Sequence, residues 1–133
     1  MTRESDTTTS VNEVQGVIVS DVRILLTTIA EDRAAELATR LVEERLAACV
    51  NICGPMTSTY RWKGCLERER ECQLIIKTTA ARVVELERRL PELHSYELPE
   101  FVVLRPEAVS RAYAAWVDES TGGQAPRSDE RRV

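Results

Sequence analysis

The 133-residue sequence has no long apolar run, and no basic stretch followed by an apolar segment stands near its start. A membrane-spanning helix needs about 20 consecutive apolar residues, and a secretory signal shows that basic-to-apolar order. An excess of basic residues is also missing, because the formal net charge at pH 7 is −4. Phosphate binding needs a basic surface, which argues against nucleic acid as the main partner. We therefore expect a soluble, cytoplasmic protein with no nucleic-acid or membrane partner.

Signatures of common active sites are absent as well. The sequence contains no GxSxG, no Cys-His-Asn arrangement and no glycine-rich phosphate loop. The only histidine, His94, could exchange protons with Glu97 or Glu100, but no nucleophile is expected beside them. We therefore expect that the protein is not an enzyme.

The cysteine spacing matches neither a zinc ribbon nor a redox CxxC pair; the four positions are Cys49, Cys53, Cys65 and Cys72. In a reducing cytoplasm they should stay as thiols, and buried small hydrophobic side chains are the simplest role. The alternative is that Cys53 and Cys72 lie diagonally on one strand face and form a soft-metal or oxidisable pair.

What the sequence does contain is a long β-hairpin over residues 46–78 that turns at Lys63-Gly64. Gly64 can adopt the positive φ that a tight turn requires. If no bulge intervenes, Val50 lies opposite Lys77, and opposite residues share a face. One face then carries a polar stripe made of Tyr60, Ser58, Glu67, Glu69, Glu71, Gln73 and Lys77. The other face carries Cys49, Asn51, Cys53, Cys72, Leu74 and Ile76.

Shorter elements stand on either side of the hairpin. A leucine-rich and β-branched run predicts a buried strand over 22–29, and a capping box that begins at Thr28 predicts a helix over 31–45. After the hairpin and a second helix, a short apolar strand is expected over 101–104.

The second and third helices have their own start and stop signals. Thr79 can cap the second helix, and Pro91 should kink it or end it near Leu90 because proline removes a helical N–H. Ser110 can cap the last helix.

The order of elements is therefore β-α-β-β-α-β with a C-terminal helix. This is the order of an α+β, ferredoxin-like sandwich, in which one antiparallel sheet carries both main helices on one face. A chain of this length has nothing left to cover the other apolar face or the edges of the long hairpin. We therefore expect a closed homo-oligomer.

The domain is expected to span residues 21–121. Residues 1–20 read as a flexible N-terminal extension, in which 17–19 could begin a strand. Residues 122–133 are polar and read as a disordered tail.

Four distinctive sequence motifs follow one another along the chain: LAACVN at 46–51, TSTYRWKG at 57–64, ECQLIIKT at 71–78 and HSYELPE at 94–100. Together they resemble the CutA family of divalent-cation tolerance proteins, and AYAAWV at 112–117 is similar to its closing helix. The resemblance implies a ferredoxin-like fold, a tightly intertwined homotrimer and a cytoplasmic location. It also implies a role in the tolerance of copper and other divalent metal cations.

The resemblance further implies a metal site in which His94 matches a copper ligand of some members. Leu26 and Leu93 stand where those members have Cys and His, so binding through few ligands should be weak. The alternative for His94 is a structural hydrogen bond, which needs no metal. Copper is the suspected ion, and no organic cofactor is expected.

Further candidates are expected to line a cleft between subunits. The acidic row suits hard cations or is simply solvated, the aromatic side chains suit a ligand or plain interface packing, and Lys77 holds an anionic ligand or neutralises Glu71. The fold is also similar to PII-type signalling trimers, so binding of a small effector or anion in these clefts is the alternative function. The candidate cleft residues are Tyr60, Trp62, Glu67, Glu71, Lys77, Tyr96 and Glu100.

Overall fold

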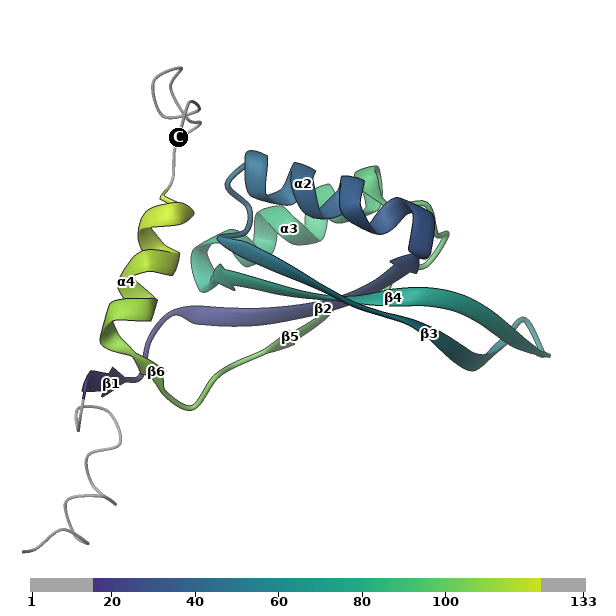
Figure 1. Cartoon of the computed structure of the whole chain (residues 1–133), viewed down its shortest axis with the longest axis horizontal. Coiled ribbons are helices and arrows are strands. Elements are labelled where there is room, and N and C mark those ends of the chain that lie inside the picture. The colour runs from purple at the N-terminus through teal and green to yellow at the C-terminus, as the bar shows by residue number, and fades with distance from the viewer. Residues whose placement is uncertain (1–15, 123–133) are drawn as a thin grey trace, which may run out of the picture.

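Residues 16–122 are described by the computed structural model of the chain (Figure 1). The elements follow the predicted order and are β1 (Val17–Ile18), β2 (Val22–Ala30), η2 (Glu31–Arg33), α2 (Ala34–Glu43), β3 (Cys49–Trp62), β4 (Cys65–Thr79), α3 (Ala80–Leu93), β5 (Val102–Leu104), β6 (Val109–Ser110) and α4 (Arg111–Ser120). None of the helices in this part of the chain is long and apolar enough to cross a membrane.

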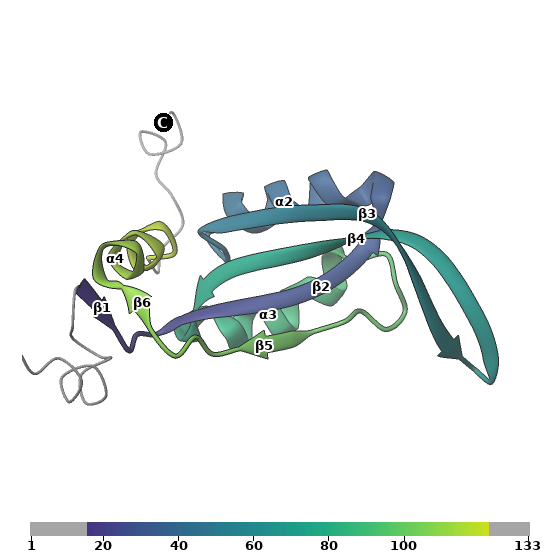
Figure 2. The same cartoon turned by 60° about the horizontal axis from the view of Figure 1, so that its bottom comes forward.

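The main sheet has four strands in the order β3-β4-β2-β5, and all neighbours are antiparallel. Both α2 and α3 lie on one side of this sheet, which stands in front of them in Figure 2. Alternate strand residues turn towards the helices and form the core with the apolar stripes of α2 and α3. The predicted α+β, ferredoxin-like fold is confirmed. The largest core side chains are Leu25, Ile29, Leu74 and Ile76 from the sheet and Leu37, Leu41, Leu86 and Leu90 from the helices.

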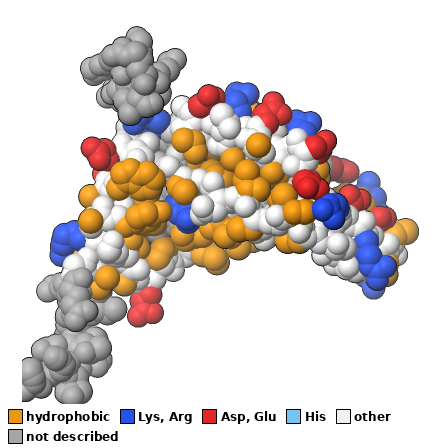
Figure 3. All heavy atoms as spheres, viewed as in Figure 1, with side chains coloured by type: hydrophobic (Ala, Val, Ile, Leu, Met, Phe, Trp, Pro, Cys, Tyr) orange, Lys and Arg blue, Asp and Glu red, His pale blue; other side chains and the backbone are white. Residues whose placement is uncertain are grey.

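The opposite side of the sheet, which we call the open face, has no helix over it. By the strand register it carries Ile24, Leu26 and Ile75, which are only partly buried, and beside them Val102 and Leu104, which are 40% and 46% exposed. Figure 3 shows hydrophobic side chains gathered over α4 and the adjoining sheet, whereas charged side chains gather over α2 and the hairpin.

The β3–β4 hairpin extends past the ends of both helices (Figures 1 and 2). Its predicted register is confirmed from the Trp62–Cys65 pair to the Met56–Glu71 pair. Beyond that point a β-bulge between Cys53 and Met56 inserts one residue in β3, so Val50 faces Ile76 and the prediction that it faces Lys77 is wrong. An inserted residue exchanges the two faces of the strand beyond it.

The bulge overturns the predicted partners of the cysteines. Cys49 now faces Lys77, and Cys53 faces Gln73, so both lie on the open face with Asn51 and not with the core residues of β4. Cys72 pairs with Ile29 and is buried towards the helices, whereas Cys53 is exposed. The alternative of a Cys53–Cys72 pair is therefore wrong, because the two side chains point to opposite faces. The simpler prediction of buried cysteines is confirmed for Cys72 and wrong for Cys53 and Cys65, which are exposed.

Two predicted helix signals are also wrong, and Thr79 stands at the N-cap position of α3 without a side-chain capping hydrogen bond. Thr28 lies inside β2 and does not cap a helix; the helical segment starts after Ala30 with no side-chain cap. Pro91 is inside α3, which continues to Leu93. Because Pro91 stands in the last turn, its missing N–H removes only one hydrogen bond near the end of the helix.

The predicted start of the last helix is confirmed, whereas most of the two predicted terminal segments lies outside the described residues. The Ser110 hydroxyl accepts a hydrogen bond from the Tyr113 N–H at 3.2 Å and caps α4. The strand considered possible at 17–19 is present as β1, which pairs with β6. The flexible extension and the disordered tail were predicted over 1–20 and 122–133, and of these segments residues 1–15 and 123–133 lie outside the described residues.

Candidate functional site

The segment between α3 and β5 brings His94 to the end of β2. The His94 ring Nδ1 accepts the Tyr96 N–H at 3.1 Å, which leaves the ring proton on Nε2, where it is donated to the Thr28 carbonyl at 2.8 Å. The residue is 9% exposed, and this burial lowers the pKa of His94 despite the hydrogen bond to Thr28. At neutral pH the imidazole is therefore neutral, with both nitrogens engaged by the protein.

Tyr96 connects this histidine to β4. Its hydroxyl group donates to Glu71 Oε2 at 2.7 Å, and its ring lies 4.8 Å from the His94 ring, centroid to centroid. Burial, followed by the hydrogen bond to Glu71, raises the pKa of the Tyr96 phenol. Glu71 is only 6% exposed, so a carboxylate of the polar stripe is enclosed beneath the loop.

Gln73 joins the loop to the sheet one step along β4. Its side-chain N–H donates to the Thr27 carbonyl at 2.8 Å and contacts Glu100 Oε1 at 3.3 Å. We call Glu71, Gln73, His94, Tyr96 and Glu100 the Glu71 cluster. The sequence correctly placed Gln73 on the polar stripe but did not indicate it as a site residue. Its contact with Glu100 makes it part of the site, and only the tertiary structure brings these two residues together.

Tyr60, Trp62 and Glu67 lie further out on the hairpin. Tyr60 faces Glu67, and partial desolvation, followed by the charges of Glu69, Glu67 and Glu71, raises the pKa of Tyr60. At the tip, Lys63 Nζ lies 5.5 Å from the centroid of the Trp62 ring and 3.8 Å from Glu97 Oε1. These contacts connect the hairpin tip to the loop that carries His94.

Lys77 is separate from these residues. It lies six positions from Glu71 on the same strand, which is about 20 Å, so the structure does not bring it near enough to neutralise Glu71. Its ammonium group donates to Asn51 Oδ1. The Lys77 side chain lines a hollow of about 550 Å³, which we call the Lys77 pocket. The residues around this pocket are Val22, Ile24, Lys77, Leu104, Arg105, Pro106, Ala108, Val109 and Tyr113.

A resident metal ion does not fit the arrangement around His94. Across residues 16–122, no group of three or more His, Cys, Asp or Glu side chains is placed to hold a metal ion. Both His94 nitrogens are hydrogen-bonded, and Glu71 Oε2 is occupied by the Tyr96 hydroxyl. A tight copper site needs three or four free donor atoms.

Comparison with known proteins gives a match along almost the whole described fold. The family described as CutA1 divalent ion tolerance protein matches residues 22–120. The chain belongs to the CutA family. Its sequence is 43% identical over 99 residues to the divalent-cation tolerance protein CutA of Thermus thermophilus, covering 74% of this chain and 96% of that protein.

Further CutA proteins agree in sequence or in structure. The mouse protein CutA is 40% identical over 68% of this chain, but the match spans only 51% of the mouse protein. The solved CutA of Synechococcus elongatus superposes with a TM-score of 0.76 at 42% identity, covering 82% of this chain and 98% of that one. A second structure of the Synechococcus CutA is complexed with a Bis-Tris molecule; it gives a TM-score of 0.71 at 44% identity and covers 78% of this chain and 98% of that one. The names of the family and of the Thermus thermophilus relative describe divalent-ion tolerance and no reaction.

Proposed function

We propose that this protein acts in the tolerance and homeostasis of divalent metal cations, copper among them, as a cytoplasmic homotrimer without enzymatic activity. The observation that carries the proposal is the family match over residues 22–120, which includes every element from β2 to α4. A relative that this chain covers to 96% of its length bears the name of a divalent-cation tolerance protein.

The open face supports assembly with further copies of the chain. It exposes apolar side chains of β5 that a soluble monomer would normally bury, and the sheet has unpaired outer edges at β3 and β5. Packing of open faces and hairpins between copies removes both features at once. A trimer is the closed assembly that the family resemblance implies.

Copper contact through His94 is expected to be weak. A metal can bind the Nδ1 lone pair only after the Tyr96 N–H leaves it, and the lost hydrogen bond opposes binding. Glu71 is the carboxylate whose charge acts on the His94 ring, and the Tyr96 hydroxyl already occupies one of its oxygens. The protein therefore contacts the cation with few ligands and releases it readily.

Two measurements test the proposal. Light scattering should give the mass of three chains, and a stable folded monomer would contradict the trimer. Calorimetric titration with Cu(II) should show a dissociation constant below about 1 mM that rises in His94→Ala and not in Glu97→Ala, an exposed neighbour. No uptake of copper or zinc below that concentration would remove metal contact from the proposal.

The second candidate is a signalling module that binds a small effector or anion between subunits. It is favoured by the Lys77 pocket and by the Bis-Tris molecule in the Synechococcus CutA structure. In this candidate function, another wall of the cleft between subunits is formed by the remaining predicted residues, which are Tyr60, Trp62, Glu67, Glu71, Tyr96 and Glu100. A thermal-shift screen with nucleotides and small anions should find a ligand whose effect is lost in Lys77→Ala; a screen in which nothing shifts the melting temperature removes this candidate.

A further inference from the structure

We infer that the Lys77 pocket binds a small organic carboxylate with an apolar body, whose negative group lies between Lys77 and Arg105. This inference deepens the effector-binding candidate and depends on it. It adds the residues Arg105 and Tyr113 and the chemical class of the ligand.

Three parts of the chain meet at this pocket. The ends of β2 and β4 supply Val22, Ile24 and Lys77, the segment after β5 supplies Leu104 to Ala108, and Tyr113 comes from the first turn of α4. In Figure 1 the β6–α4 segment folds against the end of the sheet that lies opposite the hairpin tip. The pocket therefore exists only in the folded chain, about 20 Å along β4 from Glu71, and because Ile24 and Leu104 belong to the open face it borders the proposed contact between subunits.

The charge of the pocket is positive and uncompensated. Lys77 and Arg105 line it, and no carboxylate is among the lining residues. Within residues 16–122 neither of them takes part in an ion pair, and the partner of Lys77 is the neutral amide of Asn51. An ammonium group has three donors, so Lys77 keeps donors for a ligand, and a guanidinium group matches a carboxylate with paired N–H donors.

The walls define the rest of the ligand. Six of the nine lining residues are apolar, and the volume of about 550 Å³ is in the range of small-molecule sites. Burial raises the pKa of Tyr113, so the phenol stays protonated at neutral pH and can donate a hydrogen bond at the rim. A nucleotide would need many more polar partners for its ribose and phosphates, whereas a carboxylate on a hydrocarbon or aromatic ring satisfies both the charge and the walls.

The test is calorimetric titration of the full chain with benzoate and with benzamide, which has the same shape without the charge. Benzoate should bind at least about tenfold more tightly than benzamide, because only the charged group forms charge-assisted hydrogen bonds. Arg105→Gln and Lys77→Gln should each weaken benzoate binding by about tenfold or more. Arg68→Gln, at an exposed arginine on the opposite face of the hairpin, should leave it unchanged.

A second variant keeps the test valid if a glutamine variant unfolds. Ala108→Glu places a carboxylate at the pocket wall away from the open face and should abolish benzoate binding, while the circular dichroism spectrum and the assembly mass stay those of the parent. Benzoate binding that ignores all three pocket variants overturns this site but leaves effector binding elsewhere intact. The absence of benzoate binding at millimolar concentration overturns the inference alone if the anion screen finds another Lys77-dependent ligand, and overturns both if it finds none.

Discussion

At the scale of single residues, Tyr96 encloses the one carboxylate of the polar stripe that is removed from solvent. Its hydroxyl group donates to Glu71, and its backbone N–H holds the His94 ring. The sequence offered a cation or Lys77 as the partner of Glu71, and the structure gives Glu71 a neutral donor in their place. Which glutamate is enclosed was not readable from the row of glutamates itself.

Replacing Tyr96 by Phe should destabilise the protein by about 1–3 kcal/mol, because it leaves a nearly buried carboxylate without its donor. Urea unfolding at fixed protein concentration measures the effect. Tyr60→Phe is the matched control: Tyr60 is 39% exposed, and its change should stay within about 0.5 kcal/mol. Equal losses in the two variants would mean that the Glu71 contact contributes nothing specific.

At the scale of elements, the bulge in β3 decides which side chains share a face. Gly54 has φ +124°, and a Cβ there would lie 3.3 Å from the Glu71 carbonyl and 3.2 Å from the Met56 N atom. Glycine is therefore required both by backbone conformation and by space. Gly64 at the turn has φ +82° but nothing within 4 Å of a Cβ, so it is required by conformation alone.

Gly54→Ala should therefore cost more stability than Gly64→Ala. We expect about 1 kcal/mol for the turn position and about 2–3 kcal/mol at the bulge, where strain and close contact combine. Chemical denaturation of the two variants gives the comparison. A smaller loss at Gly54 would show that the strand relaxes around the new methyl group.

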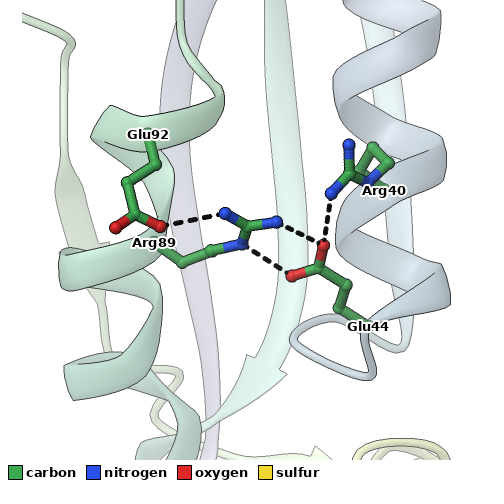
Figure 4. A network of polar contacts seen from close by, with 4 residues as sticks. All are labelled: Arg40, Glu44, Arg89 and Glu92. Carbon is green, nitrogen blue, oxygen red and sulfur yellow. Dashed lines mark hydrogen bonds and ion pairs between the residues drawn. The ribbon is translucent and has the colours of Figure 1, made fainter.

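Helices α2 and α3 are joined at their ends by the network in Figure 4. The Arg89 guanidinium contacts both oxygens of Glu44, at 2.8 and 2.7 Å, and also contacts Glu92, while Arg40 reaches Glu44 from its own helix. The hydrogen bond from Arg89 lowers the pKa of Glu44 from 4.5 to about 2, and burial opposes this shift.

This network predicts a defined acid sensitivity. Because the folded pKa of Glu44 is depressed, its stabilisation is fully present above about pH 4.5 and is lost as the pH falls towards 2. After allowance for solvent at a side chain that is 28% exposed, we expect about 1–2 kcal/mol. Unfolding free energies measured between pH 6 and pH 2.5 should therefore fall less steeply in Glu44→Gln than in the parent. Parallel curves would contradict this role.

At the scale of the whole molecule, the open face is the feature that a single chain leaves unfinished. The helices cover one side of the sheet, and the exposed strand β5 and the long hairpin remain available to other copies. The proposed trimer follows from this imbalance between apolar surface and the elements that can cover it.

A charge placed on the open face should break the assembly. Val102→Asp introduces a carboxylate beside Leu26, and burying it between subunits would be costly, so light scattering should show a lower mass than the parent at the same concentration. Val84→Asp is the control, because Val84 is 75% exposed on α3 and away from the sheet. An unchanged mass in Val102→Asp would exclude the open face from the interface.

The sequence by itself determined the order of the elements, the α+β class, the hairpin register near the turn and the CutA family, because periodicity, turn residues and distinctive segments are local signals. Only the tertiary structure decided the bulge at Gly54, the occupied nitrogens of His94, and the separation of Lys77 from the Glu71 cluster. Each of these depends on atoms that are distant in the chain: the Thr28 carbonyl meets a ring 66 residues later, and Arg105 reaches the pocket of Lys77 through the path of β5. Local patterns carry no information on such meetings, because they arise only when the sheet and its loops pack together.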